Sequence, residues 1–166
     1  MDGNAVSTDR LSRVDVAGHL VSGRRPELEH ECEVALRDLA AENSFRLVGA
    51  DRDGGVPGPY ALSIGVEENR LVLDVRDAGG QPLRKFILAL KPFQRLIKDY
   101  FTVCDSYYSA ITQAGPAQIE AIDMGRRGLH NEGSALLRDR LAGKIEMDHE
   151  TARRLFTVIC VLHIRH

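Results

Sequence analysis

Three successive runs of alternating apolar residues between positions 60 and 90 constrain the fold of this chain more than any other feature. Alternation places every second side chain on one face of a strand, and residues 68–69 and 77–82 are turn-forming sequences between the runs. Consecutive strands joined by tight turns pair antiparallel, with one face on the core. The sequence therefore predicts a three-stranded antiparallel meander, and a short alternation over 11–16 adds a fourth strand.

Helical periodicity accounts for most of the remaining sequence. We expect helices over 26–42, from Pro92 to about 112, over 116–124, over 131–141 with Asn131 as N-cap and Gly143 as the stop, and after Asp148. Residues 125–130 would then form a loop, and the alternative is that residues 123–137 run as a single bent helix. The prediction is an α+β fold, in which a small antiparallel β-meander of three to four strands is covered by four to five helices. We expect residues 1–10 to be a disordered N-terminus and 11–166 to be one domain.

Charge and hydropathy exclude several classes of protein. The formal net charge is -2 with 28% charged residues, so any binding of nucleic acid must come from a local patch. No apolar run approaches the ~20 residues of a membrane-spanning helix, and the first residues do not resemble a secretion signal. We therefore expect a cytoplasmic protein that does not bind a membrane.

The cysteine and histidine spacings predict neither a disulfide framework nor a metal site. Cys32, Cys104 and Cys160 are far apart and fall on apolar sides of predicted helices, which is typical of buried, reduced thiols. His163 and His166 are three residues apart, but His166 is the last residue, so no ligand set with metal-binding spacing is present. We expect no metal and no cofactor.

The segment 119–137 is the strongest candidate for a binding site. Arg126 and Arg127 lie between two glycines, and a helix that starts near Asn131 would point free N–H groups toward the same space. A guanidinium fork and a helix N-terminus both suit phosphate or carboxylate. The alternative is a helix junction in which the arginines pair internally with Asp123, Glu120 or Glu132.

Two other groups of residues allow different functions. His130 with Asp123 and Glu132 could form an acid–base set, because an imidazole titrates near neutral pH and a carboxylate can fix its tautomer. No nucleophile is indicated, and Ser134 is better explained by a first helical turn. Lys91, Arg95 and Lys98 share the polar face of the long helix, where they form either a row for a phosphate backbone or a solvated surface.

Several segments resemble a known bacterial family. They are PELEHECEVALRDL, SIGVEENRLVLDV, KPFQRLIKDYFTVCDSYYSAI, IEAIDMGRRGLHNEGSALLRDRL and TARRLFTVICVLHIR, and the most specific of them contains IDMGRRGLHNEG. They are similar to the uncharacterised protein family UPF0262. This resemblance implies one intact bacterial cytoplasmic domain, and it brings no assigned reaction, ligand or catalytic residue.

The leading hypothesis is a non-enzymatic binding or regulatory domain that recognises an anionic or phosphate group on a small molecule, RNA or a partner protein. The candidate ligand-binding residues are Arg126, Arg127, His130, Asn131, Lys91, Arg95 and Lys98. One alternative is a hydrolase-type enzyme with His130 as general base. Another is a homodimeric interaction module that uses the last helix, whose segment TVICVLHI is apolar almost all round and is therefore central to the core or a dimer contact.

Overall fold

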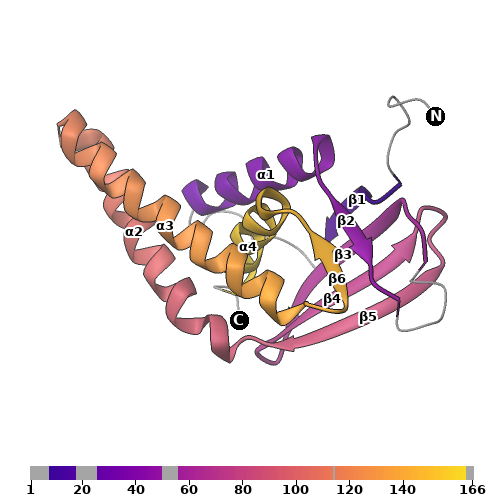
Figure 1. Cartoon of the computed structure of the whole chain (residues 1–166). Coiled ribbons are helices and arrows are strands. Elements are labelled where there is room, and N and C mark those ends of the chain that lie inside the picture. Colours follow the sequence, from indigo (N-terminus) through magenta and orange to yellow (C-terminus); the bar gives the residue numbers. More distant parts are fainter. Residues whose placement is uncertain (1–7, 18–25, 50–55, 114, 164–166) are drawn as a thin grey trace.

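The three alternating segments between positions 60 and 90 form three adjacent strands of a four-stranded sheet in the computed structural model of the chain, which describes residues 8–17, 26–49, 56–113 and 115–163 (Figure 1). Strands β3 (Tyr60–Glu67), β4 (Arg70–Asp77) and β5 (Pro82–Ala89) pair antiparallel in that order. Glu68 and Asn69 have φ values of 50° and 61°, as the tight turn between β3 and β4 requires. The predicted meander is confirmed.

The fourth strand exists, but it pairs parallel to its neighbour. Strand β1 (Leu11–Val16) lies beside β3, so the sheet order is β1-β3-β4-β5 and the sheet is mixed and not purely antiparallel. Helix α1 (Pro26–Ala41) follows β1 in the chain, and a parallel pair needs such a crossover, because a tight turn would reverse the chain. Two short strands that were not predicted, β2 (Phe45–Leu47) and β6 (Ile145–Met147), form a separate antiparallel pair.

Three further helices follow the sheet. A short 3-10 turn η1 (Lys91–Phe93) leads into α2 (Gln94–Gln113), and α3 (Pro116–Arg140) returns alongside it. The last helix is α4 (His149–His163), and Asp148 caps it as predicted, because its Oδ1 accepts the backbone N–H of Thr151 at 2.8 Å. Gly143 has a φ of 79° in the connection after α3, a conformation that favours glycine.

The predicted loop over 125–130 and the predicted helix start at Asn131 are wrong, and the alternative of one helix through residues 123–137 is confirmed. Helix α3 runs unbroken through both positions. Gly125 and Gly128 are exposed, and a Cβ added at either would meet no atom within 4 Å. The helix continues because its other face packs on α2 and α4, with Leu137 fully buried in the core.

Helix α4 lies at the centre of the molecule. It packs between α1 and α3 and over β3, and its residues from Thr151 to Leu162 are buried except for Arg153 and Arg154. The apolar surface of this helix is thus covered within the chain, which corresponds to the core interpretation and leaves no exposed stripe for a second copy. Cys32, Cys104 and Cys160 are free and buried, as predicted. The α2–α3 hairpin extends beyond the other helices (Figure 1).

Some predictions concern residues outside those described. These are most of the disordered N-terminus predicted for 1–10, and His166. Within the described part of the chain, no helix is long and apolar enough to cross a membrane. The same residues contain no group of three His, Cys, Asp or Glu side chains that could hold a metal ion.

Candidate functional site

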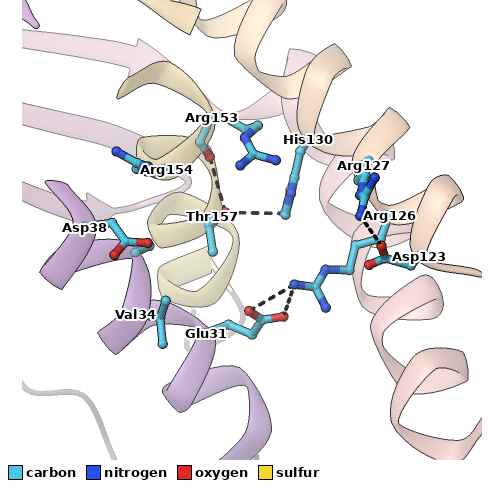
Figure 2. Close-up of a pocket in the computed structure, with 11 residues that line it drawn as sticks. Glu31, Val34, Asp38, Asp123, Arg126, Arg127, His130, Arg153, Arg154 and Thr157 are labelled. Atoms are coloured by element: carbon cyan, nitrogen blue, oxygen red, sulfur yellow. Dashed lines mark hydrogen bonds and ion pairs between the residues drawn. The ribbon is translucent and has the colours of Figure 1, made fainter. Parts of the chain in front are cut away.

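A polar pocket of about 320 Å³ lies where α1, α3 and α4 meet (Figure 2). Helix α3 supplies Asp123 and three residues of the predicted site, while α1 and α4 supply the other walls. The lining residues are Glu31, Val34, Ala35, Asp38, Asp123, Arg126, Arg127, His130, Arg153, Arg154 and Thr157. Four guanidinium groups and three carboxylates therefore border one concave space, whose size is that of a small-molecule site.

Arg126 is held in place by groups on two other helices. Its Nη2 lies 3.0 Å from Oε1 of Glu31 on α1 and donates to Oε2 at 3.4 Å. The guanidinium carbon also lies 5.1 Å from the centroid of the Tyr107 ring on α2. Since the two side chains of the ion pair are only 20% and 13% exposed, Arg126 joins α1, α2 and α3 at the edge of the pocket.

Arg127 stands at the exposed rim of the pocket. Its Nη2 lies 2.9 Å from Oδ2 of Asp123, one helical turn earlier on α3, and the arginine side chain is 69% exposed. An exposed pair of this kind holds its partners weakly, so Arg127 keeps donors that can turn toward a ligand. Asn131 lies mid-helix, where its backbone N–H is used in the helix, so it offers no helix start to an anion.

His130 is buried against aromatic and hydroxyl neighbours instead of carboxylates. Its Nε2 lies 3.4 Å from Oγ1 of Thr157 on α4, and its ring centroid lies 5.2 Å from that of Tyr100. Thr157 Oγ1 donates to the Arg153 carbonyl at 3.2 Å, so the hydroxyl oxygen is available to accept a hydrogen bond from the Nε2–H of His130. Burial, with Arg126 and Arg153, lowers the pKa of His130 from 6.5 to about 4 against the opposing effect of Asp123.

The other predicted residues do not gather at the pocket. Glu132 is on the α2 side of α3, where its Oε2 lies 3.5 Å from Nη2 of Arg95. Arg95 also pairs with Asp99 at 3.3 Å, so it bridges two carboxylates across α2 and α3. Lys91 and Lys98 are exposed near it. The proposed acid–base set of His130, Asp123 and Glu132 is therefore not joined by hydrogen bonds among the described residues.

Sequence reasoning missed the half of the pocket that comes from α1 and α4. Arg153 and Arg154 lie on the partly exposed side of α4, and their adjacent positions in the segment TARRLF were the available signal. Arg153 Nη2 contacts Glu150 at 3.2 Å, whereas its buried Nε has no hydrogen-bond partner among the described residues. Arg154 donates from Nη1 to the Glu42 carbonyl at 3.2 Å.

A second polar network joins the lower part of α3 to the start of α4. Ser134 Oγ lies 3.0 Å from Nδ1 of His149 and donates to the His149 carbonyl at 3.0 Å, and Nε2 of His149 lies 3.0 Å from Asn131 Oδ1. Ser134 is fully buried, and its hydroxyl contacts two atoms of His149. The serine is therefore a packing link and not an accessible nucleophile.

Comparison with known proteins identifies the family of the chain. The family described as "Uncharacterised protein family (UPF0262)" matches residues 8–165. A UPF0262 protein of Rhodospirillum rubrum is 53% identical over 164 residues, which cover 99% of this chain and 98% of that protein. One from Chelativorans sp. is 56% identical over 160 residues, with 96% and 97% covered. No solved structure matches. The chain belongs to the bacterial UPF0262 family.

Proposed function

We propose that this protein is a cytoplasmic, non-enzymatic binding domain that recognises an anionic group of a small molecule in the pocket between α1, α3 and α4. The observation behind the proposal is the convergence of four arginines on one concave space (Figure 2). Two of them, Arg126 and Arg127, come from the segment in which the sequence predicted an anion site. The other two, Arg153 and Arg154, provide the additional donors that the sequence analysis expected from a helix start at Asn131.

The donors of Arg153 and Arg154 support this assignment. Arg153 Nε is buried without a hydrogen-bond partner in the described chain, and Arg154 contacts only a backbone carbonyl there. Donors of this kind gain most from an incoming carboxylate or phosphate, because charge-assisted hydrogen bonds are the stronger ones. The guanidinium groups of Arg126 and Arg153 also lower the pKa of His130, as expected where the electrostatic potential is positive.

Other functions have less support. The hypothesis of an enzyme with His130 as general base predicts a carboxylate within hydrogen-bond reach of the imidazole, and the imidazole contacts Thr157 and Tyr100 instead. The hypothesis of a nucleic-acid surface along Lys91, Arg95 and Lys98 has less support because two carboxylates pair with Arg95.

The cytoplasmic location in the proposal is supported by the buried, free cysteines, which suit a reducing compartment.

Calorimetric titration with inorganic phosphate, glutarate and a short RNA tests the proposal. We expect one or both small anions to bind, and Arg153→Gln plus Arg154→Gln to weaken that binding roughly tenfold or more, as expected for lost charged hydrogen bonds. Arg138→Gln plus Arg140→Gln is the matched control, because these arginines are exposed on α3 and lie outside the pocket.

Two results would contradict the proposal. One is the absence of binding by every anion at millimolar concentration with the fold intact by circular dichroism. The other is anion binding that the control pair weakens as much as the pocket pair. Binding of the RNA alone, lost in a Lys91→Gln plus Lys98→Gln variant, would support the nucleic-acid alternative.

A further inference from the structure

We infer that the pocket takes a dipolar small molecule, with an amino group toward the α1 carboxylates and a carboxylate or phosphate toward the α4 arginines. This inference rests on the proposed function and adds the class of ligand to it. The probes that represent the class are L-glutamate and phosphoethanolamine.

The charges of the pocket are divided between its walls. Every charged lining residue from α1 is a carboxylate, namely Glu31 and Asp38, and every one from α4 is an arginine, namely Arg153 and Arg154 (Figure 2). Helix α3 contributes both signs. A ligand with only negative charge would meet repulsion at the α1 wall, whereas a dipolar ligand is attracted by both walls.

Most charged side chains of the pocket form ion pairs within the chain, and the two that do not, one acidic and one basic, carry opposite charges. Glu31 pairs with Arg126, Asp123 with Arg127, and Arg153 with Glu150. Asp38 and Arg154 have no ion-pair partner among the described residues, and no ion pair joins them to each other, although both line the pocket. A bound molecule that carries one positive and one negative group could satisfy both.

The rest of the lining suits the body of such a molecule. Val34 and Ala35 provide a short apolar surface on α1 on the same wall as Asp38. His130 and Thr157 provide hydrogen-bonding groups without charge near neutral pH. The volume of about 320 Å³ is at the small end of the range for ligand pockets, which favours a compact metabolite over a polymer.

Two matched pairs of probes isolate the amino group. L-Glutamate differs from glutarate, and phosphoethanolamine from ethyl phosphate, by the amino group alone. In calorimetric titration we expect the amino member of at least one pair to bind about tenfold more tightly than its partner. Asp38→Asn is expected to remove that preference while it keeps the binding of the member without an amino group, and Arg154→Gln is expected to weaken both members.

Controls separate this inference from the proposed function. Glu33→Gln, an exposed change on α1 outside the pocket, should leave the preference intact, and Asp38→Ser repeats the test if Asp38→Asn unfolds in circular dichroism. Equal binding within both pairs, or a preference that survives both Asp38 changes, overturns the dipolar ligand and leaves the anion site standing. Failure of all four probes and of inorganic phosphate overturns both.

Discussion

At the scale of single residues, one ion pair at the pocket joins two distant parts of the sequence. The partly buried ion pair between Glu31 and Arg126 spans 95 residues of chain, and Arg126 also lies over Tyr107. Removing one member of such a pair leaves an uncompensated charge, which costs more than the pair itself contributes. Arg126 is thus better suited to hold three helices together than to move onto a ligand.

His130 makes the stability of the fold depend on pH. The folded state keeps its imidazole neutral, with a pKa of about 4, whereas the unfolded chain binds a proton below pH 6.5. The unfolded state therefore gains protons first as the pH falls, and the stabilising effect, complete above pH 6.5, is lost between pH 6.5 and 4. The full loss is roughly 3 kcal/mol.

Urea denaturation of the wild type and of His130→Gln at about pH 7 and about pH 4.5 measures this loss. We expect the wild type to lose more free energy of unfolding than the variant, by about 2 kcal/mol. The exposed His30→Gln variant should follow the wild type. Parallel losses in all three proteins would show that His130 is not the group responsible.

At the scale of the elements, α3 combines three glycines that have different roles. A Cβ at Gly133 would lie 2.5 Å from three ring carbons of Phe156 on α4, and Phe156 is fully buried. Gly125 and Gly128 face open space. Glycine is therefore needed at 133 for the close approach of α3 and α4, while the other two only lower the helix propensity.

Alanine substitutions distinguish these roles. Gly133→Ala should lower the free energy of unfolding by about 2 kcal/mol, because the buried ring cannot move aside. Gly128→Ala should raise it by about 1 kcal/mol, the usual difference between the two residues inside a helix. Thermal and chemical denaturation measure both changes, and similar melting temperatures for the two variants would contradict this account of the interface.

Prediction from sequence succeeded where the signal is local and failed where packing between distant segments decides the structure. Strand alternation is a local pattern, so the meander of β3, β4 and β5 could be predicted from residues 60–90. Two glycines in α3 suggested a loop, but each costs only about 1 kcal/mol, and packing of the other helix face outweighs that cost. The parallel pairing of β1 could not be predicted because it depends on contacts about 50 residues away in the chain.

The candidate site was predictable only in part for the same reason. Arg126 and Arg127 stood out because they are adjacent and flanked by glycines in the sequence. Asp38, Arg153 and Arg154 belong to helices that reach the pocket only after folding, and each segment alone looks like an ordinary solvated helix face.

At the scale of the whole molecule, the buried centre and the projecting hairpin differ in packing. Helix α4 is surrounded by α1, α3 and the sheet, whereas the outer part of the α2–α3 hairpin exposes Ile111 and Met124, which are 50% and 64% accessible. Local opening requires less free energy where few apolar groups are buried. The hairpin end is therefore expected to open without the core.

Hydrogen exchange followed by mass spectrometry tests this difference. Backbone amides of residues 117–122 should exchange faster than those of residues 152–162, which we expect to open only with global unfolding. Gly133→Ala should speed exchange in α4 more than in the hairpin end. Equal protection of the two regions would indicate that the hairpin end belongs to the same cooperative unit as the core.

The projecting end of the α2–α3 hairpin also provides a position at which a fluorescent label can be attached. Gly115, which precedes α3, is exposed and has open space on its Cβ side, and Asp123 is the first residue of α3 that borders the pocket. Seven residues lie between these two positions, and the eight steps from 115 to 123 correspond to about 12 Å along the helix. A fluorophore coupled to a cysteine introduced at position 115, with the three native thiols shielded in the interior, would report on ligand arrival without blocking the entrance.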